Sequence, residues 1–201
     1  MLSQLRPALV LFLALTLTTG LAYPLAITGI AGVLLPEKAA GSLIQRDGTT
    51  IGSGLIGQSF TSARYFHGRP SATVAPDPAD AAKTVPAPYN AANSGGANLG
   101  PTSAALSERL RTDVAALEAE NPGQPVPTDL VTTSGSGLDP DISPEAARFQ
   151  IPRVAKARGL SDEKLADLVA GRIQGRWLGL LGEPRVNVLA LNLALDDLVR
   201  K

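Results

Sequence analysis

The chain has 201 residues, of which 44% are hydrophobic and 18% are charged, and its basic and acidic side chains balance to no formal net charge. A balanced charge gives no electrostatic footprint for nucleic acid, so we expect no nucleic-acid partner. The sequence has no cysteine, which excludes disulfides and thiolate metal sites, and its one histidine, His67, cannot form a multi-histidine metal site by itself. This length suits one domain, or one domain with an appendage.

The N-terminal region is apolar for long enough to cross a membrane. No charged residue lies between Arg6 and Glu37. A membrane span needs about 20 apolar residues, whereas the apolar core of a signal peptide has only about 7–15. We therefore predict an uncleaved transmembrane helix over residues 8–31, which Pro24 could kink. A cleaved signal peptide and a buried core helix are the alternatives.

The residues that flank this helix predict its orientation. Arg6 and the N-terminal amine precede the span, and Lys38 and Arg46 follow it. A short tail without acidic residues is easily left on the cytoplasmic side. We predict a single-pass protein with a short cytoplasmic tail over residues 1–7 and an extracytoplasmic domain over residues 32–201, which are enough to bury a core.

The outer domain is predicted to begin with a β-hairpin. Asp47-Gly48 is a strong turn dipeptide, flanked by strands predicted at residues 41–45 and 49–56. The aromatic residues within 60–66 favour core packing.

Residues 71–102 show no periodicity and contain several prolines. Loops of this length are usually functional or disordered. Residues 89–100 mix an aromatic residue with amides, a hydroxyl and glycines, which suits a structured binding loop. This loop is our first candidate site, for a partner or a nucleotide, and its candidate residues are Tyr89, Asn90, Ser94, Gly95, Gly96, Asn98 and Gly100.

Helices dominate the second half of the predicted domain. We predict one over residues 104–120, one from Pro144 to the region of Gly159 with a kink at Pro152, and a third after Ser161 that carries Leu165, Leu168 and Ile173 on its inner face. The predicted N-caps are Ser103, Ser143 and Ser161. The alternating leucines within residues 186–195 predict a final strand. Strands at both ends with helices between them predict an α+β fold.

A second candidate loop reads TTSGSGLDPDIS over residues 132–143. Its candidate residues are Ser134, Gly135, Ser136, Gly137 and Asp139. Asp139 and Asp141 could share a hard cation, but a turn and a helix start also explain them, and the ligand set is small. We therefore predict no metal site.

Catalytic motifs are not found. The sequence has no phosphate-binding G-x-x-x-x-G-K-[ST] loop and no G-x-S-x-G elbow. A serine hydrolase would need Ser134 or Ser136 as nucleophile and His67 as its base. The tripeptide Ser-Gly-Gly at residues 94–96 also occurs in the signature sequence of ABC-type ATPases, where it contacts a nucleotide phosphate, but it is equally ordinary loop chemistry. We expect no catalytic residues.

Six segments together resemble the KdpC family, the C subunits of bacterial Kdp potassium-transporting P-type ATPases. They are GSGLIGQSF (52–60), YFHGRPSA (65–72), YNAANSGGANLGPT (89–102), PTDLVTTSGSGLDPDIS (127–143), QIPRVAKARGL (150–160) and GEPRVNVLALNLAL (182–195). The resemblance covers nearly the whole chain. Two positions depart from the family pattern: Asp141 stands where many members have histidine, and Ala97 where many have serine.

The resemblance implies a non-catalytic accessory subunit of a potassium importer in the bacterial inner membrane. The implied partners are a channel-like A subunit, an ATP-hydrolysing P-type B subunit and a small F subunit, besides membrane lipid. The family is assigned a role in assembly and, as a catalytic chaperone, in raising the ATP affinity of the B subunit. No cofactor of its own is implied, and ATP is the one ligand that the family proposal raises.

The predicted topology and the family role lead to different expectations about whether the two loops contact ATP. ATP is cytoplasmic, whereas residues 32–201 are predicted to lie outside, so an effect on ATP affinity would be allosteric. The alternative is a nucleotide-binding regulatory subunit whose Gly/Ser loops contact ATP directly. A membrane-anchored serine hydrolase is a more remote alternative.

Overall fold

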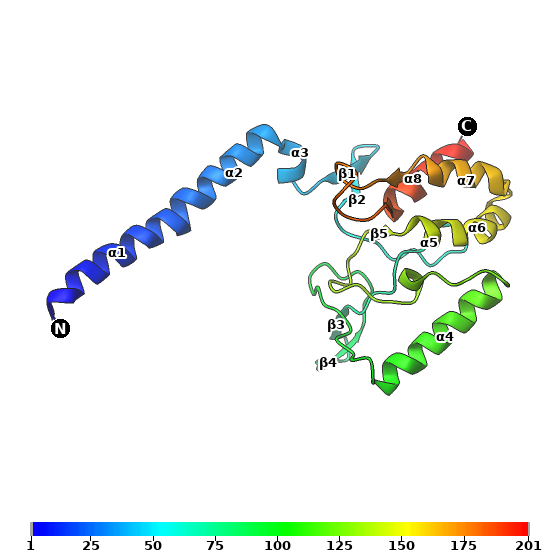
Figure 1. The fold of residues 1–201 in the computed structure, drawn as a ribbon, viewed down its shortest axis with the longest axis horizontal. Helices are drawn as coiled ribbons and strands as arrows, with labels where there is room; N and C mark the ends of the chain where they lie inside the picture. Colours follow the sequence, from blue (N-terminus) through cyan, green and yellow to red (C-terminus); the bar gives the residue numbers. More distant parts are fainter. Residues whose placement is uncertain (1, 201) are drawn as a thin grey trace. The chain divides into compact units, whose positions relative to one another are not determined.

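The computed structural model describes residues 2–200 and has the predicted mixed α+β composition (Figure 1). The chain divides into two compact units between Ser53 and Gly54, and we describe each unit by itself.

The first unit is dominated by one long apolar helix. A short 3-10 turn, η1 (Leu2–Gln4), leads into α1 (Leu5–Leu17), a π-helical turn η2 (Thr18–Ala22) and α2 (Tyr23–Leu34). Together they form a 30-residue helix, Leu5–Leu34, with a mean hydropathy of 1.9 and no buried side chains in its most apolar stretch. This helix is longer than the predicted residues 8–31 and is long enough to cross a bilayer with tilt.

The π-helical turn lies just before Pro24, where the sequence predicts an irregularity. Proline has no N–H and its ring clashes with the carbonyl one turn earlier, so the regular ladder cannot continue through it. The N–H of Tyr23 donates to the carbonyl oxygen of Thr18. The hydroxyls of Thr18 and Thr19 donate to the carbonyl oxygens of Ala14 and Leu15 at 2.8 and 2.7 Å. These bonds satisfy polar groups that would be costly in lipid.

A short helix and the predicted hairpin complete the first unit. After α3 (Pro36–Ala39), strands β1 (Leu43–Arg46) and β2 (Thr49–Ser53) pair antiparallel. The turn residues Asp47 and Gly48 have φ of 53° and 77°, which confirms the predicted two-residue hairpin turn.

The second unit contains two small sheets and the remaining helices. One sheet is a hairpin of β3 (Val74–Asp77) and β4 (Asp80–Pro86); the other has the antiparallel order β5-β7-β6. The elements of the second sheet and the helices are α4 (Ala104–Glu120), η3 (Thr128–Leu130), β5 (Asp141–Ile142), α5 (Pro144–Phe149), α6 (Ile151–Arg158), α7 (Asp162–Ala170), β6 (Ile173–Gln174), β7 (Arg185–Asn187) and α8 (Val188–Arg200).

The predicted helix starts are confirmed. The hydroxyls of Ser103, Ser143 and Ser161 each accept a bond from the backbone N–H three residues later. The second predicted helix is broken into α5 and α6 at Gln150, two residues before Pro152, and it ends at Gly159 with φ of 66°. These are local signals, so the sequence alone reveals them.

Three predictions for the second unit were wrong in part. Residues 71–102 were expected to lack regular structure, but they contain the β3–β4 hairpin. Ile173 lies in β6, because α7 already ends at Ala170. The predicted strand over residues 186–195 is β7 for its first two residues only, and the rest is α8.

The side chain of Asn187 explains the change from strand to helix. Its Oδ1 accepts a bond from the N–H of Ala190 at 3.0 Å, which caps the first turn of α8. Val188, Leu191 and Leu195 then follow helical spacing and are all buried. Leucine at every second position fits the two-residue repeat of a strand. The same leucines also include Leu191 and Leu195, which are four residues apart as on one face of a helix, so the cap decides between the two structures.

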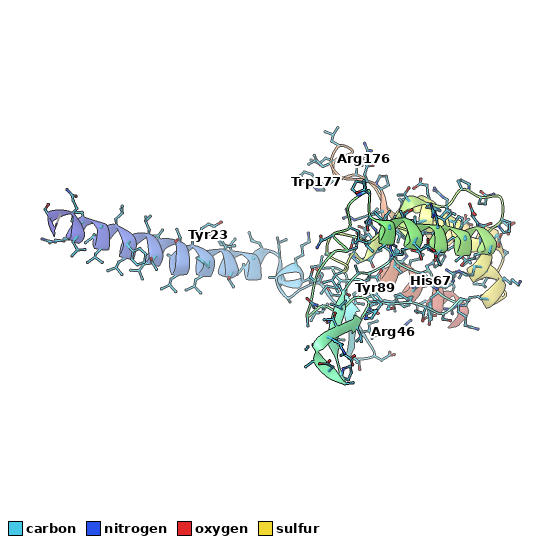
Figure 2. The ribbon with its side chains drawn as sticks, turned by 90° about the horizontal axis from the view of Figure 1, so that it is seen from below. Tyr23, Arg46, His67, Tyr89, Arg176 and Trp177 are labelled. Carbon is cyan, nitrogen blue, oxygen red and sulfur yellow. The ribbon has the colours of Figure 1, made fainter. Side chains whose placement is uncertain are left out.

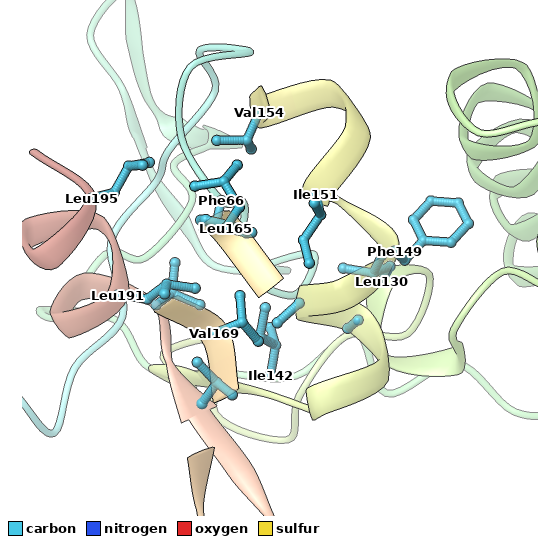
Figure 3. Packing of buried hydrophobic residues seen from close by; sticks show 14 of the residues in the cluster. Phe66, Leu130, Ile142, Phe149, Ile151, Val154, Leu165, Val169, Leu191 and Leu195 are labelled. Carbon is cyan, nitrogen blue, oxygen red and sulfur yellow. The ribbon is translucent and has the colours of Figure 1, made fainter. Parts of the chain in front are cut away.

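The hydrophobic core gathers the inner faces of α5, α6, α7 and α8 and the sheet strands β5 and β7 (Figure 3). Phe66, from a segment without regular structure, is completely buried among them. Phe60 packs against this core and Tyr65 against Phe60, with ring centroids 5.5 Å apart, so the predicted packing role of these aromatics is confirmed.

Two side-chain amides hold the backbone of this segment. Asn192 of α8 accepts from the N–H of Phe66 and donates to its carbonyl oxygen, both at 2.9 Å. Gln150 accepts from the N–H of His67 at 2.8 Å and donates to its carbonyl oxygen at 3.1 Å. Each amide supplies the donor and acceptor that a neighbouring strand would otherwise supply.

Arginine side chains continue this pattern. Arg153 donates to the carbonyl oxygens of Ala63 and Tyr65 at 2.8 and 2.9 Å, and Arg158 donates to that of Arg64 at 2.8 Å. The guanidinium of Arg158 also lies 4.6 Å from the centre of the Tyr65 ring. The segment from Ala63 to His67 is therefore fixed by side chains of the helices that it crosses.

We expect Asn192→Ala and Gln150→Ala each to lower the free energy of unfolding by about 2–4 kcal/mol, because each leaves a buried N–H and carbonyl without partners. Urea unfolding of the full chain in detergent would measure the loss. Gln124→Ala, at an exposed glutamine, is the matched control and should change stability by less than about 0.5 kcal/mol. A similar small change in all three variants would contradict the role given to the amides.

Candidate functional site

The two loops predicted as candidate sites lie against each other. The N–H of Gly95 and the hydroxyl of Ser94 donate to the carbonyl oxygen of Ser136, at 2.9 and 3.1 Å. A Cβ on Gly96 would lie 3.0 Å from the carbonyl oxygen of Gly135, so the two backbones are in close contact. We call residues 89–100 and 132–139 together the paired loops.

Within the second loop, the serine hydroxyls act as turn caps. The hydroxyl of Ser134, which is buried, accepts from the N–H of Gly137 at 2.9 Å. The hydroxyl of Ser136 accepts from the N–H of Leu138 at 3.1 Å. Together with the N–H of Gly95, these are donors that a phosphate cradle would direct at its ligand, and here they close the loops on themselves.

Gly137 lies at a close approach of the two loops to each other and to Thr73. Its φ is 67°, and a Cβ there would lie 2.6 Å from Cγ2 of Thr73 and 2.7 Å from the carbonyl oxygen of Gly95. Both the backbone conformation and the space therefore require glycine.

Tyr89 and Asn90 hold the first loop in place and are half-buried, which corrects the expectation that this part of the loop is exposed. The hydroxyl of Tyr89 donates to the carbonyl oxygen of Arg69 at 2.7 Å, and its ring fills the space beside Gly57 and Gly68. Burial, and then the charge of Asp139, raise the pKa of Tyr89 to about 12, so it remains a neutral donor.

The side chain of Asn90 bonds to the strand that precedes the loop. Its Nδ2 donates to the carbonyl oxygen of Val74 at 2.8 Å, and its Oδ1 accepts from the N–H of Ala92 at 3.1 Å. The exposed parts of the loop are residues 91–94 and 98–100. A hollow of about 300 Å³ lies beside it, lined by both loops and by Leu106 of α4.

Three residues that the sequence analysis did not single out connect the paired loops to residues 63–67. Arg69 donates to the carbonyl oxygens of Thr132 and Thr133, both at 3.3 Å, and pairs with Asp139 at 3.0 Å. Ser71 donates to the carbonyl oxygen of Gly137 at 2.7 Å, and the hydroxyl of Thr73 accepts from the N–H of Asn90 at 3.1 Å. Their only signal in the sequence was their place in or beside the segment YFHGRPSA.

Comparison with known protein families gives a match over nearly the whole chain. Residues 5–197 match the protein family described as KdpC, the c chain of the K⁺-transporting ATPase. The chain is 75% identical to the potassium-transporting ATPase KdpC subunit of Methylorubrum extorquens and 74% identical to that of Methylobacterium nodulans, over all 201 residues and the full length of each relative. The corresponding subunit of Bradyrhizobium diazoefficiens is 70% identical over the same length.

The chain belongs to the KdpC family. Its resemblance to that family is thereby confirmed, and the quoted segments can be placed in the structure. Segments 65–72, 89–102 and 127–143 meet at the paired loops and their supports, whereas 150–160 and 182–195 carry Gln150 and Asn192. Much of what makes this KdpC sequence recognisable therefore serves to hold irregular backbone in place.

The aspartates of this KdpC chain have structural partners. Asp139 pairs with Arg69, and its Oδ1 accepts from the N–H of Asp141 at 3.1 Å. Asp141 pairs with Arg185 at 3.0 Å and accepts from Asn187 at 3.2 Å. Within the described residues no group of three or more His, Asp or Glu side chains is placed to hold a metal ion.

These aspartates border a cleft of about 510 Å³, lined also by Arg69, Asp129 and Arg185. Burial raises the pKa of Asp141, and the Arg185 charge opposes that shift. Asp129, which the sequence did not single out, supports the start of α5: its carboxylate accepts from the N–H and hydroxyl of Ser143 at 2.7 and 3.0 Å.

His67 does not act on either serine of the second loop. Its Nε2 donates to the carbonyl oxygen of Ser62 at 3.0 Å, while Ser134 and Ser136 bond within their own loop. Burial, and then the nearby Arg153 charge, lower the pKa of His67. A hydrolytic pair of His67 with one of these serines therefore has no support in the geometry.

We expect Gly137→Ala to destabilise the paired loops, because its Cβ would meet two neighbours and its φ is strained for alanine. A loss of about 2–4 kcal/mol in the free energy of unfolding is the expected result, measured by urea unfolding of the full chain. Gly135→Ala is the matched control, since a Cβ there meets nothing within 4 Å. Equal stability of the two variants would show that the close packing at Gly137 is not needed.

Proposed function

We propose that this chain is the KdpC subunit of an ATP-driven potassium-import complex, anchored in the bacterial inner membrane by Leu5–Leu34. The observation that carries the proposal is identity of 70–75% over the full chain to proteins named as that subunit. The one candidate span found among residues 2–200, followed by a separate compact unit, agrees with a membrane-anchored accessory subunit.

The subunit acts by assembly and has no catalytic residues of its own. Its partners are the channel-like A subunit, the ATP-hydrolysing B subunit and the small F subunit. The exposed part of the paired loops, at Ser94 and at residues 98–100, is the surface that meets a partner. Arg69, Ser71 and Tyr89 hold the paired loops in place. This favours a role in binding, because recognition loops held on a rigid scaffold lose little entropy on binding.

The second unit lies outside the membrane and the N-terminus lies in the cytoplasm. The effect of the subunit on ATP affinity in the B subunit is then allosteric and passes through the N-terminal helix. A tenfold increase in affinity needs only about 1.4 kcal/mol of coupling, which a change in helix packing can supply. The internal bonds of Ser94, Ser134 and Ser136 support this mechanism over direct contact with phosphate.

Direct nucleotide contact is the second candidate, and one observation favours it. The exposed Asn98 lines the hollow of about 300 Å³ between the paired loops, and an adenosine could reach its side chain there. This candidate requires the second unit to lie in the cytoplasm, where ATP is.

Co-purification tests the proposed partners. A tagged chain extracted in mild detergent should bring with it a channel-like protein of many spans and a P-type ATPase. We expect Leu99→Asp to reduce their recovery by at least about tenfold, since a buried unpaired carboxylate at an interface costs several kcal/mol. Leu55→Asp, at another exposed leucine, is the matched control. Full recovery with Leu99→Asp would remove the paired loops from the interface.

Cysteine labelling tests the topology, because the natural chain has no cysteine. We expect Ser94→Cys in intact cells to react with a membrane-impermeant maleimide that enters only the periplasm. Ser3→Cys should react only after the inner membrane is opened. The reverse pattern would place the paired loops in the cytoplasm and support direct contact with ATP.

A further inference from the structure

The loop between β6 and β7 exposes four large apolar side chains on one turn. Trp177, Leu178, Leu180 and Leu181 are 67%, 74%, 80% and 60% exposed. Among the described residues of the second unit, the other exposed large hydrophobic side chains are the separate Leu55 and Leu99. We call residues 177–181 the apolar tip. Figure 2 shows Trp177 and its neighbour Arg176 on a loop that stands away from the body of this unit.

The apolar tip is a closed hairpin. The N–H of Trp177 donates to the carbonyl oxygen of Leu181 at 2.8 Å, and the N–H of Leu181 donates back at 3.0 Å. Leu178 and Gly179 turn the chain with φ of 52° and 74°. At its base, Arg176 pairs with Glu183 at 2.7 Å. The hairpin thus satisfies its own backbone at both ends of the turn and directs its leucines and tryptophan outward.

This chemistry fits the interfacial region of a lipid bilayer. Tryptophan concentrates where headgroups meet acyl chains, and leucine inserts beyond it. Residues 177–182 contain no acidic side chain, and Glu183 is already paired with Arg176. The turn therefore brings no uncompensated negative charge toward lipid.

A bilayer is also close to this unit at all times. The chain between Leu34, the end of the apolar helix, and Gly54 can extend by at most about 3.5 Å per residue, so the second unit stays near the membrane that holds the helix.

A protein partner is a poorer fit to the apolar tip, because a standard interface uses about 20–30 residues a side. Four side chains on one turn suit insertion better than docking.

We propose that the apolar tip inserts into the interfacial region of the bilayer that holds the N-terminal helix, as a second point of membrane attachment. With two attachments, the second unit is restricted in its tilt over the membrane, which presents the paired loops in one orientation. The proposal rests on the membrane span and is independent of potassium transport.

Trp177 provides the test, because it is the only tryptophan in the chain. The full chain is reconstituted into phosphatidylcholine vesicles with or without lipids brominated near the headgroup. We expect a blue-shifted emission that brominated lipid quenches and that aqueous iodide does not. The double variant Leu178→Asn, Leu180→Asn should lose quenching by brominated lipid and gain quenching by iodide.

Matched variants keep the result interpretable. Leu178→Met with Leu180→Met keeps an apolar turn and should retain quenching by brominated lipid. Leu55→Asn changes an exposed leucine outside the tip and should have no effect. Quenching of Trp177 by iodide and not by brominated lipid in the natural chain would overturn the proposal. Protection from both quenchers would also overturn it, since a protein surface, such as a second copy of the chain, would then cover the tip.

Discussion

The second unit depends on side chains that satisfy a backbone segment lying outside any sheet. Phe66 is completely buried, so its N–H and carbonyl need partners, and it belongs to none of the sheets in the described part of the chain. Asn192 and Gln150, from α8 and the junction of α5 and α6, bond to Phe66 and His67 in turn. A buried amide that makes both of these bonds stabilises the fold and also fixes the position of the backbone segment, because a small shift would leave polar groups unpaired.

The position of the paired loops depends on the segment of residues 63–67. Beyond His67, the chain continues through Arg69 and Ser71, which donate to carbonyl oxygens of the second loop, and Thr73, which accepts from the N–H of Asn90 in the first loop. Glycine at position 137 then allows the loops to approach to backbone contact. The glycines and serines that suggested a phosphate cradle are explained by this close approach, and the exposed surface that they support is the one that we propose meets a partner.

The first unit poses a different physical problem. In lipid, the polar groups freed near Pro24 have no water to bond, and the π-helical turn with the hydroxyls of Thr18 and Thr19 satisfies them within the helix. Such a turn leaves small and hydroxyl side chains where another helix can pack closely. We propose that the coupling to ATP affinity passes through this turn.

Local signals determined much of this protein. The apolar run of the N-terminal helix, the Asp47-Gly48 hairpin, the serine caps and Gly159 all depend on near neighbours in the sequence, and the structure confirms each of them. The quoted segments also established the family, which the comparisons confirm. The sequence was sufficient to predict these features, because each of them requires particular residues at short spacing.

Only the tertiary structure decided how the remaining residues are used. The leucines of residues 188–195 fit two periods, and the cap supplied by Asn187 selects the helix. The meeting of the paired loops, the support from Arg69 and the burial of Tyr89 depend on contacts between residues far apart in the chain. No local pattern encodes such contacts, because they exist only once the core has brought those segments together.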